Sequence, residues 1–257
     1  MKIHWDDHAD FYNEMAMMEL PYTDRQLDCL EIQPTDTVLD VGCGPGRISI
    51  LSARRAKRVT SLDASARMLE HLRENAQRLG VSGKIDTILI DWFDAVPEVD
   101  VQKHDIVIAS RTEAMRDLEG LTRLARKYAA VMGWANAPSI PEIINRLYDG
   151  VQEERYGAQG GPPRTREQGY NQIFERVYSL GYEPNVKILP DGFTKFFANV
   201  EEALSFFWGL RPGLVEDRRG RLRENLEPYL KTEPDGRVTF LIETRSCVIW
   251  WNPEKDT

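Results

Sequence analysis

The sequence predicts an α/β fold with a doubly wound, seven-stranded sheet that is mostly parallel and ends in an antiparallel strand. Two observations lead to this prediction. Within residues 38–136, short apolar runs typical of buried strands alternate regularly with segments of helical periodicity. A less regular stretch follows, and residues 238–251 then form a last β-rich run. N-terminal helices and a helical insertion before this run complete the expected architecture.

The individual elements follow from periodicity and from the residues that end each one. A helix over residues 65–79 has its apolar residues on one face, and Gly80 ends it. Thr23 is expected to cap a second N-terminal helix, which closes before Pro34. The expected strands are residues 38–41, 58–62, 84–90, 105–110, 128–135, 182–189 and 238–251. The expected helices are residues 4–18, 22–32, 47–56, 65–79, 118–126, 141–156, 167–180, 199–207 and 216–230, with a loop at 158–165.

The central motif is residues 38–50, VLDVGCGPGRISI, a buried strand that runs through a glycine turn into a helix. The glycines stand at alternate positions, Gly42, Gly44 and Gly46. They allow a sharp turn and a close approach of the backbone to a ligand, and the helix start presents free N–H groups there. A dinucleotide fingerprint would need a third glycine at Arg47, whose side chain would crowd a pyrophosphate. Asp40 would also repel a pyrophosphate, but it can accept hydrogen bonds from the ammonium group of an amino acid.

Two further carboxylates are expected at the same edge of the sheet. Asp63 ends the second strand about twenty residues after the first glycine, where it can bind ribose hydroxyls or cap the next helix. Asp91 and Trp92 follow the third strand. Asp91 can accept a hydrogen bond from an adenine amino group, and the ring or backbone of Trp92 can line the base.

The glycine turn resembles motif I of the class I S-adenosylmethionine (SAM) dependent methyltransferases, of the small-molecule, methyltransferase-11/25-like type. The W-D-x-x-A-x-x-Y pattern of residues 5–12 is similar to the N-terminal segment that covers SAM in many of these enzymes, and residues 105–110 correspond to their motif IV. The resemblance implies a Rossmann-like fold, SAM as cofactor and S-adenosylhomocysteine (SAH) as product. It implies cofactor contacts from Tyr12, Asp40, Gly42, Cys43, Gly44, Asp63, Ala64, Met68, Asp91, Trp92, Ser110 and Arg111.

The chain is expected to be one methyltransferase domain over residues 1–257. Residues 1–33 would cover the cofactor, 34–136 form the SAM-binding core, 137–236 form a helical cap that contacts substrate, and 237–257 contain the final strand. The cap should lie over the carboxyl edge of the sheet, where residues 141–207 would build most of the acceptor pocket. Its aromatic residues are expected to be core: Phe193, Phe196, Phe197, Phe206, Phe207 and Trp208.

The composition of the chain limits the kinds of partner that it is expected to bind. A net charge of −8 argues against a surface that binds a nucleic-acid backbone, and the arginines of residues 218–223 are interleaved with acids, as in a solvated helix. No apolar run is long enough for a membrane span, so we expect no membrane partner. The three cysteines form no C-x-x-C pair, which favours reduced thiols in a cytoplasmic protein and no metal site. The chain is expected to be a monomer or a homodimer.

The predicted function is methyl transfer from SAM to an unidentified, small-molecule acceptor. The alternatives are a protein- or RNA-directed methyltransferase and a non-catalytic SAM-binding subunit with a regulatory or assembly role. No catalytic base can be named. His71 is expected to be exposed and His104 lies at the amino end of its strand, while His4 and His8 belong to the cofactor cover.

Overall fold

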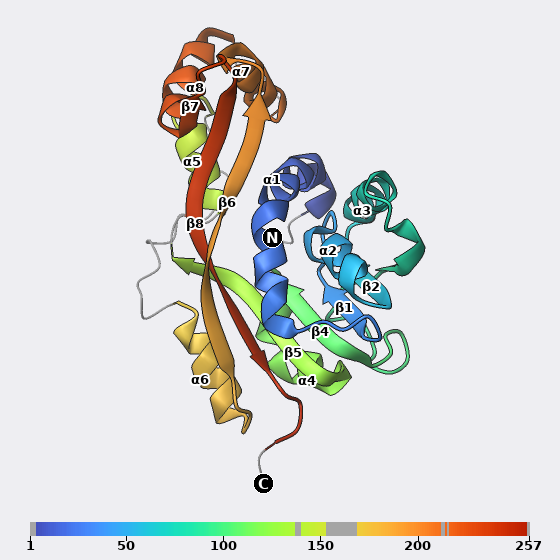
Figure 1. The fold of residues 1–257 in the computed structure, drawn as a ribbon. Coiled ribbons are helices and arrows are strands. Elements are labelled where there is room, and N and C mark those ends of the chain that lie inside the picture. Colours follow the sequence, from blue (N-terminus) through green and yellow to red (C-terminus); the bar gives the residue numbers. More distant parts are fainter. Residues whose placement is uncertain (1–3, 137–139, 153–168, 212–213, 215, 256–257) are drawn as a thin grey trace.

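The structure is a computed structural model that describes residues 4–136, 140–152, 169–211, 214 and 216–255 (Figure 1). Its strands are β1 (Thr37–Val41), β2 (Arg58–Asp63), β3 (Ile85–Leu89), β4 (His104–Ser110), β5 (Ala125–Asn136), β6 (Asn185–Phe197), β7 (Leu230–Thr232) and β8 (Val238–Trp251). Its α-helices are α1 (Ala9–Leu27), α2 (Arg47–Arg55), α3 (Ala66–Arg78), α4 (Leu118–Leu124), α5 (Ile140–Leu147), α6 (Asn171–Ser179), α7 (Val200–Gly209) and α8 (Arg219–Leu226).

The sheet has the order β3-β2-β1-β4-β5-β8-β6, and the short strand β7 pairs with β8. The strands β1 to β5 pair in parallel, whereas β8 runs antiparallel to both β5 and β6. The predicted doubly wound sheet with an antiparallel last strand is therefore confirmed, with β7 as an additional strand.

Helices cover both faces of the parallel strands, which explains why these strands are continuously apolar. On one face, Leu27 of α1 and Leu51 of α2 belong to a buried cluster with Ile106 of β4. On the other face, Leu121 of α4 and Val177 of α6 pack in a second cluster. The two layers fix the sheet, so that the carboxyl ends of β1, β2 and β4 meet at one edge.

The strands β6 and β8 extend beyond this edge. The last residue of β5, Asn136, pairs with Arg245, so the part of β8 before Arg245 and its partners in β6 continue past the end of β5 (Figure 1). The helices α5, α7 and α8 pack on this extension around Phe207 and Phe240. We call the extension of β6 and β8, together with β7, α5, α7 and α8, the arm.

The two predicted N-terminal helices are one helix, α1, which continues through Pro21. Thr23 does not cap a new helix, because its Oγ1 atom donates a hydrogen bond to the Glu19 carbonyl. The helix packs closely on β6: a Cβ atom at Gly192 would lie 3.1 Å from the Tyr22 ring, and Tyr22 Oη lies 2.7 Å from Thr194 Oγ1. This packing outweighs the cost of about 3 kcal/mol for a proline inside a helix.

The sixth strand is longer than predicted, because β6 continues through Pro190, Asp191 and Gly192. These residues favour a turn locally, but an edge strand tolerates proline and every residue of β6 pairs with β8. The aromatic residues of the arm are buried or partly buried as expected, with one correction: Phe196 is 73% exposed. The predicted loop at residues 158–165 lies outside the described residues.

Candidate active site

The glycine turn between β1 and α2 has a left-handed backbone at all three glycines. A Cβ atom at Gly42 would lie 2.3 Å from Thr112 Oγ1, so packing against the loop after β4 requires glycine there. At Gly44, with φ +53°, the nearest atom to an added Cβ would be Met68 Sδ at 4.0 Å. Gly44 therefore faces open space, and a ligand can approach the backbone at this point.

Asp63 spans this turn and the start of α3. One carboxylate oxygen accepts a hydrogen bond from Gly44 N at 2.8 Å, and the other accepts one from Ser65 N at 2.9 Å. Burial raises the pKa of Asp63, and these hydrogen bonds oppose the rise. The side-chain cap of α3 is Ser65, whose Oγ accepts from Met68 N, so Asp63 does not have the helix-capping role that the sequence left open.

Asp40 lies beneath the turn and is 1% exposed. Ser49 Oγ of α2 donates a hydrogen bond of 2.6 Å to its carboxylate, and Ser61 Oγ in turn donates to Ser49 Oγ. Burial raises the pKa of Asp40 to about 6, although the hydrogen bond from Ser49 acts in the opposite direction. The carboxylate is thus held against α2, directly below the glycine turn.

Asp91 and Trp92 follow β3, but the Trp92 ring does not face the open edge. It is 9% exposed, packs between the sheet and α4, and donates from Nε1 to Asp117 Oδ2 at 3.0 Å. Only the backbone of Trp92 therefore remains available to line a base, one of the two possibilities that the sequence left open. Asp91 Oδ1 accepts a hydrogen bond from Phe93 N.

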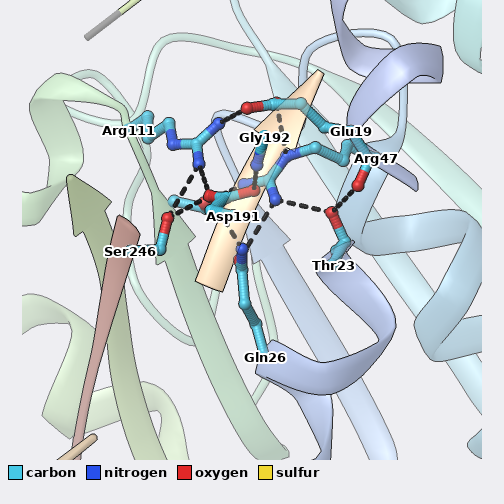
Figure 2. A network of polar contacts seen from close by, with 9 residues as sticks. Glu19, Thr23, Gln26, Arg47, Arg111, Asp191, Gly192 and Ser246 are labelled. Carbon is cyan, nitrogen blue, oxygen red and sulfur yellow. Dashed lines mark hydrogen bonds and ion pairs between the residues drawn. The ribbon is translucent and has the colours of Figure 1, made fainter. Parts of the chain in front are cut away.

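Ser110 is the last residue of β4 and Arg111 follows it. The Arg111 side chain belongs to a largely buried polar network (Figure 2), and Ser110 is hydrogen-bonded to the same network. Ser110 Oγ accepts a hydrogen bond from Arg47 Nη2. The Arg111 guanidinium donates to Glu19, Asp191 and Ser246 Oγ, and it stacks 3.3 Å above the Trp134 ring. The Ser110 hydroxyl acts only as an acceptor here, so its O–H can still donate to a ligand. Arg111 Nε is buried without a hydrogen-bond partner among the described residues, whereas the other guanidinium nitrogens are engaged within the network.

Arg47 is also part of this network, and its side chain does not lie at the glycine turn as predicted. Its side chain turns away from the glycine turn and donates to Thr23 Oγ1 at 2.8 Å and to Gln26 Oε1 at 3.2 Å, both in α1 (Figure 2). Arg47 would therefore not crowd a pyrophosphate. The buried carboxylate of Asp40 remains as the argument against one.

The N-terminal segment, a 3-10 helix at Trp5–His8 followed by the first turns of α1, lies on α3 next to Asp63. Asp6 Oδ1 accepts hydrogen bonds from Ser65 Oγ and Arg67 N. The Trp5 and Tyr12 rings meet edge to face at a centroid distance of 5.7 Å. The segment that the sequence predicts as a cofactor cover thus starts beside the predicted ribose carboxylate.

The positions of two histidines, His71 and His104, can be compared with those predicted from the sequence. His71 is buried rather than exposed, because the N-terminal segment covers it and its Nε2 lies 2.7 Å from Asp10 Oδ1. His104 begins β4 at the amino edge, as expected, and burial lowers its pKa. Within the described residues, no three histidine, cysteine, aspartate or glutamate side chains are arranged so that they could hold a metal ion. None of the helices in the described part of the chain has both the length and the apolar composition of a membrane span.

The site fits a nucleoside with an amino-acid tail. Gly44 offers an open approach to the backbone, Asp63 has acceptor oxygens beside it, and Asp40 adds a buried negative charge below. Ala64 lies between β2 and the N-cap of α3, and Met68 lies in the first turn of α3. Cys43 N donates a hydrogen bond to Leu62 O. The arrangement suits the hydroxyls of a ribose and the ammonium group of an amino acid.

Comparison with known proteins agrees with this geometry. The sequence profile of a family described as a methyltransferase domain matches residues 38–133, which include most of the segment from β1 to β5. A protein of Haemophilus influenzae, described as uncharacterized, is 31% identical over 260 residues and covers 98% of this chain and 90% of its own length.

Named relatives match over shorter stretches. A 23S rRNA (uracil(1939)-C(5))-methyltransferase of Polynucleobacter necessarius is 35% identical to this chain where the two align. The aligned stretch covers 35% of this chain and only 19% of that protein. A probable cobalt-precorrin-6B C(15)-methyltransferase of Methanobrevibacter smithii is 31% identical over 45% of this chain and 63% of its own length.

A solved structure extends the similarity to the whole fold. The SAM-dependent methyltransferase of Thiobacillus denitrificans, crystallised with SAH, aligns with a TM-score of 0.51 at 15% identity and covers 90% of this chain and 92% of its own. The glycine turn, the carboxylates around it, the family match over residues 38–133 and this common fold lead to one conclusion: the core of the chain is a methyltransferase domain with the fold of the class I SAM-dependent methyltransferases.

Proposed function

We propose that the chain transfers the methyl group of SAM to a small-molecule acceptor bound between the carboxyl edge of the sheet, α1 and the arm. The observation that carries the proposal is the position of Gly44, which faces open space beside Asp63 and below the N-terminal segment. In this assignment the cofactor lies on Gly42, Cys43 and Gly44. Asp63 binds the ribose, and the backbone of Asp91 and Trp92 lines the adenine.

SAM supplies a methyl carbon activated by its sulfonium, and transfer is an in-line displacement by the acceptor. The protein's task is then to position the two reactants and exclude water. In this proposal the glycine turn and Asp63 orient the cofactor, and Tyr12 and Trp134, which pack against the hydrophobic cluster of the arm, enclose the acceptor. An acceptor without an acidic proton, such as a thiolate or a tertiary amine, needs no general base from the chain.

Charge supports a small acceptor over a polymer. The arginines of α8 are paired with acids: Arg221 Nη1 lies 3.1 Å from Glu224, and Arg223 pairs with Glu201 of α7. Paired arginines on an acidic chain offer little to a phosphate backbone. The RNA methyltransferase relative favours the alternative acceptor class, but its match covers only 35% of this chain.

The cofactor placement is tested by replacing Gly44 with alanine. The added methyl group would occupy the space assigned to SAM, so SAM and SAH affinity measured by calorimetry should fall at least tenfold, by about 1.4 kcal/mol. Gly80→Ala is the matched control, because Gly80 also has a positive φ, +72°, with nothing within 4 Å of an added Cβ. It should lose a similar amount of folding stability and keep its affinity. Equal affinities in the two variants would refute the placement.

The acceptor class is tested by a screen for SAM consumption. Small thiols, amines, carboxylates and metalloids form one panel, and transfer RNA and ribosomal RNA form the second. We expect turnover only with the first panel, together with SAH in the purified protein as a trace of turnover. Activity confined to RNA would overturn the small-molecule proposal and leave the cofactor assignment intact.

A further inference from the structure

Two buried arginines lie next to the glycine turn. Arg47 is the first residue of α2, directly after Gly46, and its side chain is 8% exposed. Arg111 precedes Thr112, whose side chain packs on Gly42, and its own side chain is 13% exposed. The two arginines belong to the segments on either side of the turn, but their side chains meet at Glu19, so two positive charges lie together near the turn where solvent screens them poorly.

Two buried carboxylates from distant parts of the chain compensate these charges. Glu19 of α1 is 2% exposed and contacts both arginines, with Arg111 donating to Oε1 and Arg47 Nε at 3.5 Å from Oε2. Asp191 of β6 is fully buried and accepts from Arg111 Nη2 at 2.6 Å (Figure 2). With two cations and two anions, the network is neutral when all four groups are ionised.

The two acids nearest the turn, Asp40 and Asp63, are not in direct contact with an arginine, although the charge of Arg47 lowers the pKa of Asp40 from a distance. Among the ion pairs between described residues, none includes Asp40 or Asp63. As long as Glu19 and Asp191 neutralise Arg47 and Arg111, the net charge around the turn is negative. Removing either acid from the network would leave one buried guanidinium uncompensated beside the turn.

SAM and SAH differ at this site by one charge, since the sulfonium of SAM is a cation and the thioether of SAH is neutral. We propose that Glu19 and Asp191 are specificity-determining residues: by neutralising Arg47 and Arg111 they remove positive charge that would disfavour the cationic cofactor relative to its neutral product. This inference rests on the proposed binding of the cofactor at the glycine turn. It assigns an electrostatic role to residues that do not touch the cofactor.

The ratio Kd(SAM)/Kd(SAH) tests this role, because damage to the fold weakens both ligands alike and cancels in the ratio. Calorimetry on Glu19→Gln should give a ratio raised about four- to tenfold over the original protein, as expected for one unpaired, partly screened buried charge. The double variant Glu19→Gln/Arg47→Gln, which is neutral again, should return the ratio to within about twofold of the original.

The matched control is Asp24→Asn on the same helix, which also removes an acid from an arginine, Arg55, but in an exposed pair. It should leave the ratio unchanged. If Glu19→Gln does not fold, Arg47→Gln decides, because removing a cation must shift the ratio in the opposite direction. An unchanged ratio in a variant that still binds both ligands would overturn the inference, whereas a native protein that binds neither ligand would overturn the proposed function instead.

Discussion

Asp40 is a buried carboxylate whose hydrogen bond comes from a neutral hydroxyl, Ser49 Oγ. Burial raises its pKa from 3.8 to about 6, so ionising it in the folded protein is unfavourable. Between pH 4 and 6 the folded state holds a proton that the unfolded state has lost, and stability therefore falls as the pH rises through this window. A group kept at such a cost is expected to serve the ligand rather than the fold.

We predict that Asp40→Asn stabilises the free protein above pH 6 by about 1–3 kcal/mol, because asparagine keeps an acceptor for Ser49 without the buried charge. Urea unfolding at pH 4, 5, 6 and 7.5 measures the effect. The gain should be near zero at pH 4, grow up to pH 6 and stay constant above it. SAM affinity should fall in the same variant, since an ammonium group loses its negative partner.

The control for this prediction is Asp86→Asn, since Arg58 holds the pKa of Asp86 low through hydrogen bonds at the surface. This variant should not gain stability between pH 4 and 6. A pH-independent effect of Asp40→Asn would contradict the ionisation argument.

The glycine turn and the carboxylates around it were predictable because their spacing along strands that share an edge places them together. The Glu19, Arg47, Arg111 and Asp191 network was not. Its members are far apart in sequence, 80 residues from Arg111 to Asp191 for example, and a buried charge in an amphipathic helix has no local signature. From the sequence, Arg47 could be recognised only as the residue that stands where a dinucleotide motif would have its third glycine.

The helices and strands show the same division between local and tertiary information. The helix α3 and the strand β8 were predicted closely, because periodicity and capping residues define them locally. The break near Pro21 and the end of the sixth strand at Leu189 were wrong, since the contacts of α1 with β6 and of β6 with β8 override local turn signals. The burial of His71 likewise depends on a segment sixty residues earlier.

At the level of elements, we predict that deleting residues 1–8 raises the Kd of SAM about three- to tenfold without unfolding the protein. The deletion removes the contacts of Asp6 with Ser65 and of Trp5 with Tyr12, and with them the covering of the cofactor next to Asp63. The buried face of α1 stays in place, so the circular dichroism spectrum should be unchanged.

A single substitution refines this test. Asp6→Asn should reproduce part of the loss, whereas Asp7→Asn, a change in the exposed neighbour, should have no effect. Full SAM affinity in the shortened chain would show that the segment does not cover the cofactor.

The whole molecule has a core built from adjacent β-α units and an arm whose strands come later in the chain: β6 (Asn185–Phe197), β7 (Leu230–Thr232) and β8 (Val238–Trp251). The core was predictable to within a few residues at most boundaries, but the direction of the arm depends on the register in which β8 pairs with β5 and β6. That register carries the arm past the carboxyl edge of the sheet (Figure 1). The acceptor specificity of the molecule is expected at this junction rather than in the core.

Trp134 is placed to test that expectation. It lies at the end of β5, its ring is stacked by Arg111, and its centroid is 6.1 Å from that of Phe193 in β6. We predict that Trp134→Leu raises the KM of an acceptor identified by the screen about five- to thirtyfold, because the junction loses an aromatic wall worth about 1–2 kcal/mol. The Kd of SAM should stay within about twofold, since Trp134 is separate from the glycine turn.

The control is Phe196→Leu, which alters an exposed aromatic residue of the arm and should change neither constant.

The salt dependence of acceptor binding is an independent test. The KM of an uncharged small acceptor should vary little between 50 and 200 mM salt, whereas a phosphate polymer would bind far more weakly at the higher concentration. Equal losses of SAM affinity and acceptor use in Trp134→Leu would place the residue in the cofactor site. A steep dependence of acceptor binding on salt would move the acceptor out of an enclosed junction and onto an open charged surface.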